Sequence, residues 1–380
     1  MRRAARRPGI LTAGILLGLL LAACARPAEP EATPAASPTP LPVVQIAGRR
    51  FDAAARTIDL AGCAPAPDEL TAGLSMLPAL EQANLRGCPL SDAEKRALQT
   101  AFPDVAFGWT VSFCEIVTAD SADTLLCLDG LPVEDGDALR EKLSLLPALE
   151  RVEMRGCGLS DEEMAALAEA FPAIRFVWLV RVACFELSTD ARAFSMGQRR
   201  DTEGVRVVGE MYYHRVTNED IAPLRYCVDL EALDLGHAKN VTDISCLAGL
   251  TKLRYLVIAI MSLESVEALR GLTELVYLEC FNNQISDISP LAELKALRYL
   301  NCGMNPFTDA SPLMELEGLE RLWINRASIR REDGEALKAA LPDTQVMCAF
   351  GADPSAYGWR KGNQGYINMQ AIFGLRALGQ

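Results

Sequence analysis

A short pattern of apolar residues recurs along the second half of the chain at nearly constant spacing. Segments start at Leu230, Leu253, Leu275, Leu297 and Leu319, so they are 23, 22, 22 and 22 residues apart. Each segment carries apolar residues at its first, fourth and sixth positions, as in Leu275, Leu278 and Cys280. A unit of this length buries its apolar side only by stacking on its neighbours. The period therefore predicts a solenoid, in which each repeat adds one short strand to a parallel sheet.

This pattern resembles the leucine-rich repeat. Asn283 and Asn305 occupy its ninth position, where a side-chain amide can satisfy backbone groups left unpaired at the turn out of the strand. Residues 285–291 are similar to the internalin type of repeat, which returns by a tight turn on the convex side. The resemblance implies an α/β fold: a leucine-rich repeat solenoid, or horseshoe, with a parallel concave sheet and a helical or irregular convex side.

An internal duplication marks the first half of the chain. Residues 74–111 match residues 143–180 at a constant offset of 69, and strand-like segments at 57–60 and 125–128 also fit the repeat. In each copy a serine stands three residues before a glutamate, and this capping-box spacing predicts the start of a convex helix. The pairs are Ser91 with Glu94 and Ser160 with Glu163. These repeats resemble the ribonuclease-inhibitor type, and the repeat that begins at Leu319 has the same longer spacing.

The N-terminal end has the features of an export signal. Its first 23 residues contain four arginines and no acidic residue, and the apolar run from Gly9 to Ala23 is short for a membrane span. Residues 21–24, Leu-Ala-Ala-Cys, resemble the lipobox of bacterial lipoproteins. The resemblance implies that Cys24 is diacylated, for example with palmitate, and becomes the mature N-terminus. The alternative is an ordinary signal peptide cleaved after Ala23.

These features divide the chain into six predicted parts. They are a lipoprotein signal peptide (1–23), the lipidated cysteine with a proline-rich flexible spacer (24–45), the duplicated, helix-containing repeats (46–188), a connector (189–228), the internalin-like repeats (229–348) and a C-terminal cap (349–380). Within the cap, residues 366–378 are predicted to form an amphipathic helix that covers the last strand edge, because an open solenoid end exposes unpaired backbone and apolar core.

Charge and missing motifs exclude several classes of function. The chain has 37 basic and 50 acidic residues, a net charge of -13. Removal of the leader and its four arginines leaves 33 against 50, or -17, which argues against a nucleic-acid partner. The sequence contains no Cys-x-x-Cys, His-Glu-x-x-His, Gly-x-Ser-x-Gly or phosphate-loop pattern, and its two histidines, His214 and His237, lack a nearby nucleophile pattern. We therefore predict no catalysis, no cofactor and no metal site.

The cysteines are predicted to be structural thiols. After Cys24, 11 remain, an odd number that argues against a disulfide framework. Cys280 and Cys302 fall on the buried side of adjacent predicted strands, where small thiols pack well. A metal or redox role is the alternative.

The predicted ligand-binding site lies on the exposed side of the internalin-like strands. Strand alternation sends the leucines inward and the intervening side chains out of the concave face. Aromatic residues recur there with an arginine and an amide among them, as in many interfaces. The predicted site consists of Tyr255, Tyr277, Glu279, Phe281, Tyr299, Asn301, Arg321 and Trp323. The alternative is that the tyrosines only shield the sheet, in which case the site would lie in the first half, near Arg86 and Arg155.

The mature part also resembles uncharacterised leucine-rich repeat lipoproteins of anaerobic, mainly clostridial, bacteria. The shared features are Phe-Val-Trp at 176–178, Ser-Thr-Asp at 188–190, Asp-Leu-Gly-His at 234–237 and Gly-Trp-Arg at 358–360. We predict an extracytoplasmic, lipid-anchored protein of the bacterial cell surface that binds a protein or glycan ligand without catalysis. The alternatives are a structural envelope protein and a surface hydrolase.

Overall fold

The structure is a computed structural model that describes residues 42–133, 135–197, 199–200, 206–207, 215–348 and 356–374. The predicted signal peptide, Cys24 and most of the predicted spacer lie outside the described residues. The described part from Val43 onward belongs to one compact unit.

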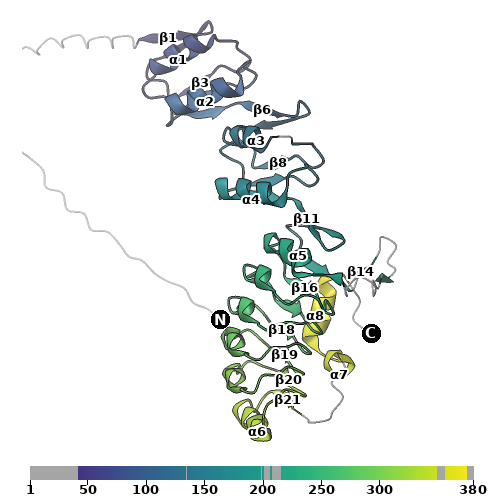
Figure 1. Cartoon of the computed structure of the whole chain (residues 1–380). Helices are drawn as coiled ribbons and strands as arrows, with labels where there is room; N and C mark the ends of the chain where they lie inside the picture. Colours follow the sequence, from purple (N-terminus) through teal and green to yellow (C-terminus); the bar gives the residue numbers. More distant parts are fainter. Residues whose placement is uncertain are drawn as a thin grey trace, which may run out of the picture. The chain divides into compact units, whose positions relative to one another are not determined.

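A seven-stranded parallel sheet forms the second half of the chain (Figure 1). Its strands, in spatial and sequence order, are β13 (Ala193–Ser195), β16 (Ala232–Asp234), β17 (Tyr255–Val257), β18 (Tyr277–Glu279), β19 (Tyr299–Asn301), β20 (Arg321–Trp323) and β21 (Gln345–Met347). The strands pair in register, so that Tyr255, Tyr277 and Tyr299 are neighbours. The leucine-rich repeat solenoid predicted from the period is confirmed.

Short helical returns cross the convex side of these repeats. They are the 3₁₀ helices η3 (Ser245–Leu247), η4 (Glu267–Leu269), η5 (Ser289–Glu293) and η6 (Ser311–Glu315), and the longer α6 (Arg331–Ala340) after β20. The middle residue of each strand from β16 to β20 is a leucine that points into the space between sheet and returns, where Leu278 and Leu300 are fully buried. The tight returns and the longer last repeat match the predicted spacings.

The ninth-position asparagines join successive repeats. The Asn305 amide donates hydrogen bonds to the carbonyl oxygens of Cys280 and Cys302, both at 3.0 Å, and to that of Gly303 at 3.2 Å. Its side-chain oxygen accepts from the backbone N–H of Ile285 at 3.1 Å. Asn283 makes the equivalent contacts one repeat earlier. The predicted role of these amides is therefore confirmed.

The first half contains two smaller parallel sheets with helices on the convex side. The first sheet is β3 (Thr57–Asp59), β4 (Gln82–Asn84) and β5 (Ala106–Gly108), with α1 (Pro67–Ser75) and α2 (Asp92–Ala101). The second is β8 (Leu125–Cys127), β9 (Arg151–Glu153) and β10 (Arg175–Val177), with α3 (Gly136–Leu143) and α4 (Asp161–Ala170). Both predicted capping boxes are present, at the start of α2 and of α4.

Three antiparallel hairpins precede the three sheets and were not predicted. They are β1 (Val43–Ile46) with β2 (Arg49–Asp52), β6 (Thr110–Phe113) with β7 (Val117–Asp120), and β11 (Leu179–Val182) with β12 (Phe185–Ser188). Each hairpin packs on the helix that follows the next parallel strand. Ile46 contacts the backbone of α1 so closely that a Cβ on Gly73 would lie 2.4 Å from its side chain. The repeating unit therefore comprises a hairpin followed by parallel strands, and is longer than the duplication seen in the sequence.

The predicted connector, residues 189–228, supplies part of the solenoid. Its strand β13 pairs with β16 at the start of the large sheet. It also contains the short hairpin β14 (Arg199–Arg200) with β15 (Arg206–Val207), the helix α5 (Asn218–Ile221) and the 3₁₀ helix η2 (Ala222–Tyr226). The third hairpin docks here, because the Ala183 N–H donates to the Asp220 carbonyl at 3.0 Å.

The C-terminal cap lies in a different place from the one predicted. Its helices α7 (Ala356–Arg360) and α8 (Gln364–Ile372) extend across the strands on the side opposite the convex returns, not over the edge of the last strand (Figure 1). The backbone of Gly365 in α8 is so close to Tyr299 of β19 and Tyr277 of β18 that a Cβ there would lie 2.5 and 2.7 Å from their rings. The physical reason is the large apolar area on this side of the sheet, which the helices remove from water.

Replacement of Asn305 by Ala should lower the free energy of unfolding by about 3 kcal/mol, because several buried backbone groups lose their partner at once. Chemical denaturation measures the change. The matched control is Gln284→Ala, an exposed position in the neighbouring repeat, for which we expect a change within about 0.5 kcal/mol. Equal effects at both positions would show that the asparagine ladder does not hold the repeats together.

Candidate functional site

The predicted ligand-binding residues share one face of the seven-stranded sheet, but most of them are buried. We call this face, which carries Tyr277 and Glu279, the concave face. Tyr277 and Glu279 are both 0% exposed, and Trp323 is 8% exposed. Tyr255, Phe281 and Asn301 are also buried, whereas Tyr299 and Arg321 are half-buried. The prediction that these side chains form an open surface is wrong, because residues 356–374, here called the C-terminal segment, pack against them.

An aromatic cluster joins the C-terminal segment to the concave face. The ring of Trp359 lies 5.8 Å from that of Tyr277 and 5.6 Å from that of Trp323. The ring of Tyr366 lies 6.4 Å from that of Tyr277. Trp359 and Met369 are 0% exposed. Tilted ring pairs at these separations are favourable beyond the area they bury.

A buried carboxylate organises the centre of this contact. Glu279 accepts hydrogen bonds from Arg360, whose Nε and Nη2 lie 2.9 and 2.6 Å from its two oxygens. It also accepts from the Trp359 indole N–H at 3.0 Å and from the Tyr277 hydroxyl. Burial, together with the charge of Glu279, raises the pKa of Tyr277, so this hydroxyl stays protonated and donates. The segment is thus recognised by an ion pair with two parallel bonds, next to an aromatic contact.

A second acid, Asp234, lies buried on the same face in β16. Its oxygens accept from the Gly236 N–H at 3.0 Å and from the Ser195 hydroxyl at 3.3 Å. Burial raises the pKa of Asp234, and the nearby charge of Arg360 opposes this shift. The C-terminal segment therefore brings a positive charge to a face that holds two buried acids.

Sequence reasoning missed the main partners of this face: Trp359, Arg360, Tyr366 and Met369. The Gly-Trp-Arg run at 358–360 carried a family resemblance but no predicted contact. Gly358 packs closely on the sheet, since a Cβ there would lie 3.0 Å from the Trp323 ring and would push that ring slightly away. A run of small, aromatic and basic residues after the last repeat was the signal available in the sequence.

The remaining arginines considered as a site are held in ion pairs. Arg86 makes two hydrogen bonds to Asp120, at 2.5 and 2.6 Å. Arg155 contacts Asp129 at 2.8 Å and Glu153 at 3.1 Å. These pairs are partly exposed, so each contributes little to stability.

The described cysteines match the predicted structural thiols. All eleven cysteines in the described part are free thiols, and Cys280 and Cys302 are buried as predicted. Burial raises the pKa of Cys302 to about 12, which makes its thiol a poor nucleophile. His237 is exposed on the turn after β16, and His214 lies outside the described residues.

The group Cys127, Asp129 and Glu153 has metal-ligand spacing, with ligand atoms within 4.8 Å of one another. Arg155 already pairs with both of these carboxylates, so a cation at this point would meet a fixed positive charge. The arrangement therefore fits an ion-pair network better than a metal centre.

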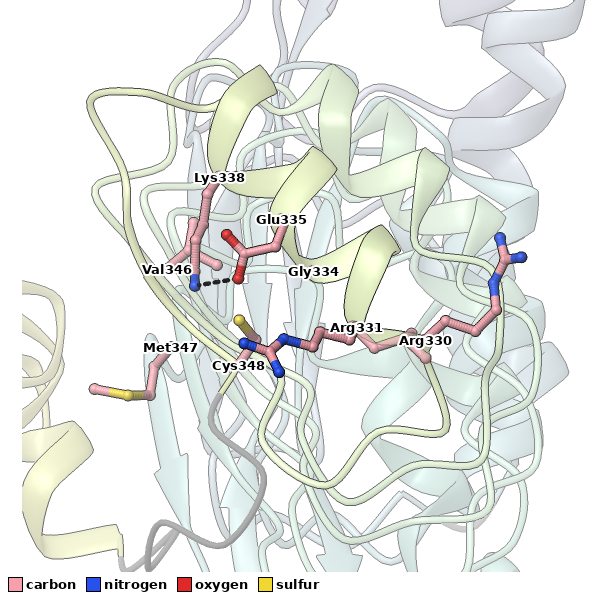
Figure 2. A pocket seen from close by; sticks show the side chains of 9 residues that line it. Arg330, Arg331, Gly334, Glu335, Lys338, Val346, Met347 and Cys348 are labelled. Atoms are coloured by element: carbon pink, nitrogen blue, oxygen red, sulfur yellow. Dashed lines mark hydrogen bonds and ion pairs between the residues drawn. The ribbon is translucent and has the colours of Figure 1, made fainter.

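A cavity of about 320 Å³ lies between α6 and β21 (Figure 2). Its lining residues are Ile329, Arg330, Arg331, Gly334, Glu335, Lys338, Val346, Met347 and Cys348. Figure 2 shows Arg331 next to Cys348, and Lys338 donating to Glu335 at 3.1 Å. Its walls carry charges of both signs, so it does not select one ligand class. A second cavity of about 380 Å³ lies next to the hairpin β6–β7, between Phe113 and Leu139.

The sequence and structure together define a leucine-rich repeat protein. The family model described as "Leucine Rich repeats (2 copies)" matches residues 273–313, which include β18 and β19. No curated protein matches the chain.

Three internalins of Listeria monocytogenes are among the similar solved structures. Internalin C2 is 20% identical, with 67% of this chain and 92% of that chain covered and a TM-score of 0.33. Internalin InlF is 18% identical, with 80% and 84% covered and a TM-score of 0.30. The functional domain of InlJ, described as including a cysteine ladder, is 12% identical, with 79% and 50% covered and a TM-score of 0.31.

Replacement of Asp234 by Asn should stabilise the fold increasingly as the pH rises above the ordinary carboxyl pKa of about 4. The folded-state pKa of Asp234 is raised above 3.8, so the cost of burying its charge is absent at low pH and appears as the pH increases. Thermal melting of both proteins across this range measures the difference. Asp343→Asn, at an exposed position, controls for the loss of one negative charge. A pH-independent difference for Asp234→Asn would show that burial does not raise the pKa of this carboxyl.

Proposed function

We propose that this chain is a non-catalytic, lipid-anchored extracytoplasmic protein that binds a polypeptide segment on its concave face. The observation that carries the proposal is that this face already holds a polypeptide segment of the same chain. Glu279 accepts hydrogen bonds from both the Trp359 indole N–H and the Arg360 guanidinium. An interface of this depth and chemistry is typical of protein recognition and favours a protein over a glycan ligand.

Electrostatics favour a basic partner. After loss of the leader the chain carries 33 basic and 50 acidic groups. On the concave face, Asp234 and Glu279 are both buried acids. Such a balance attracts basic protein segments and repels nucleic acid. A nucleic-acid partner is therefore not part of the proposal.

The anchor is proposed from the sequence. The arginine-rich leader, the lipobox-like residues before Cys24 and the proline-rich run after it form a consistent order for a bacterial lipoprotein. Within the described part of the chain, no helix is long and apolar enough to cross a membrane. Two or three acyl chains on Cys24 would hold the repeats at a membrane surface, and the spacer would separate them from the headgroups.

Replacement of Cys24 by Ala should release the protein from membranes, because the acyl chains have no other attachment site in the proposal. Detergent phase partitioning of the chain expressed in a bacterium measures this. The wild type and a Cys114→Ala control, which changes an exposed thiol of the repeats, should both enter the detergent phase. Retention of Cys24→Ala in that phase would contradict the lipid anchor.

The ligand class is tested by probing a random peptide array and a glycan array with the full chain. We expect signals on peptides in which an aromatic residue is followed by arginine or lysine. Glu279→Gln keeps the shape of the side chain but removes its charge, and should abolish the preference for the basic residue. Signals on glycans alone would overturn the proposal, and silence on both arrays would favour a structural envelope protein.

A further inference from the structure

The C-terminal segment is attached to the concave face differently from the way the repeats are attached to each other. Neighbouring repeats share backbone hydrogen bonds between in-register strands. Among the described residues, the hydrogen bonds from the segment to the repeats each involve a side chain, as when Arg321 donates to the Trp359 carbonyl at 2.9 Å. Side-chain contacts, and not a shared ladder of backbone hydrogen bonds, therefore hold the segment on the concave face.

The contact also leaves buried polar atoms without a hydrogen bond. Trp323 Nε1 belongs to β20 and Asn325 Oδ1 to the turn after it, while Asn363 Nδ2 and Gln370 Nε2 belong to the segment. All four residues are at most 8% exposed, and none of these atoms has a partner among the described residues. Each such group loses its hydrogen bond to water when the face closes, so closure is weaker than the buried aromatic area suggests.

Close backbone approach at Gly365 makes the closed state sensitive to small changes. A Cβ at this position would meet the rings of Tyr299 and Tyr277 at 2.5 and 2.7 Å. Two separate points therefore hold the segment down: steric fit at Gly365, and the ion pair of Arg360 with Glu279 at 2.6 Å. We expect a change at either point to open the face without touching the leucine core.

We infer that the C-terminal segment is an internal competitor that occupies the binding face until a partner segment of like chemistry displaces it. The inference rests on the proposed function. The partner presents an aromatic side chain followed directly by arginine or lysine, because Tyr277 and Trp323 receive the ring and Glu279 receives the cation. Only molecules from whose concave face the segment has detached can bind the partner. The apparent affinity of the full chain is therefore lowered in proportion to the fraction in this open state.

The experiment uses the full chain and a fluorescein-labelled synthetic peptide of residues 356–374, with fluorescence anisotropy as the readout. The wild type should bind the peptide weakly. Arg360→Glu and Gly365→Val should each bind it about 10-fold more tightly or better, because their own segment no longer competes. Lys361→Glu, an exposed position between them, reverses a charge in the same segment and should behave as the wild type. A peptide carrying Arg360→Glu should not bind to any of these proteins.

Hydrogen exchange of the wild type provides a test that needs no variant. Amides of α8 should exchange through an opening that is less costly than the opening of β18 and β19. If the amides of α8 exchange only when the whole protein unfolds, the inference is wrong. It is also wrong if the Arg360→Glu and Gly365→Val variants fold but bind the peptide no better than the wild type. If array peptides still bind in that case, the proposed function stands and only the competitor is wrong. If neither array peptides nor the segment peptide bind, both fail.

Discussion

In-register pairing of parallel strands is the constraint on which the second half of this protein depends. Each repeat adds one strand at the same level, so residues 22 positions apart become neighbours, as Tyr255, Tyr277 and Tyr299 do. The same pairing places Leu278 and Leu300 together in the core on the other side. Aromatic residues at one repeat position therefore produce a continuous apolar row on the concave face. Such a row must be covered, and the C-terminal segment covers it.

The first half follows the same repeat but does not extend one sheet. A hairpin stands between β5 and β8 and another between β10 and β13, and the described strands form separate sheets on either side of each hairpin. Each hairpin then packs on the following helix, so the units are joined through side chains and isolated hydrogen bonds such as Ala183 to Asp220. The outward positions of these strands hold no aromatic residue. Several are polar or charged, such as Asn84, Arg151 and Glu153, so these sheets lack the aromatic row that is covered in the second half.

Local and periodic signals in the sequence predicted those features that arise from residues close together in the chain. The repeats, the capping box at Ser91 and the Asn305 ladder each have a cause within one or two repeats, and all are present. The contact between Trp359 and Tyr277 joins residues 82 positions apart, and no period marks it. The row of aromatic residues indicated that something would cover the concave face. A separate ligand and a segment of the same chain would bury this row equally well, so the sequence did not distinguish them. The three hairpins were missed because their short strands resemble the repeat strands around them in composition.

The charge of Glu279 is the feature of the concave face that distinguishes a binding role from simple burial of apolar surface. If the segment only stabilised the fold, an apolar residue at position 279 would serve at least as well. Burial of the ion pair requires desolvation of both charged groups, which costs free energy. The concave face supplies Tyr277 as a donor, and the C-terminal segment supplies the indole of Trp359 and the guanidinium of Arg360. In the proposed binding role, Glu279 would favour a segment that brings a cation beside a ring, since an apolar segment would leave a buried charge unpaired. Selectivity of this kind is what the proposed binding role requires and what a structural cover does not.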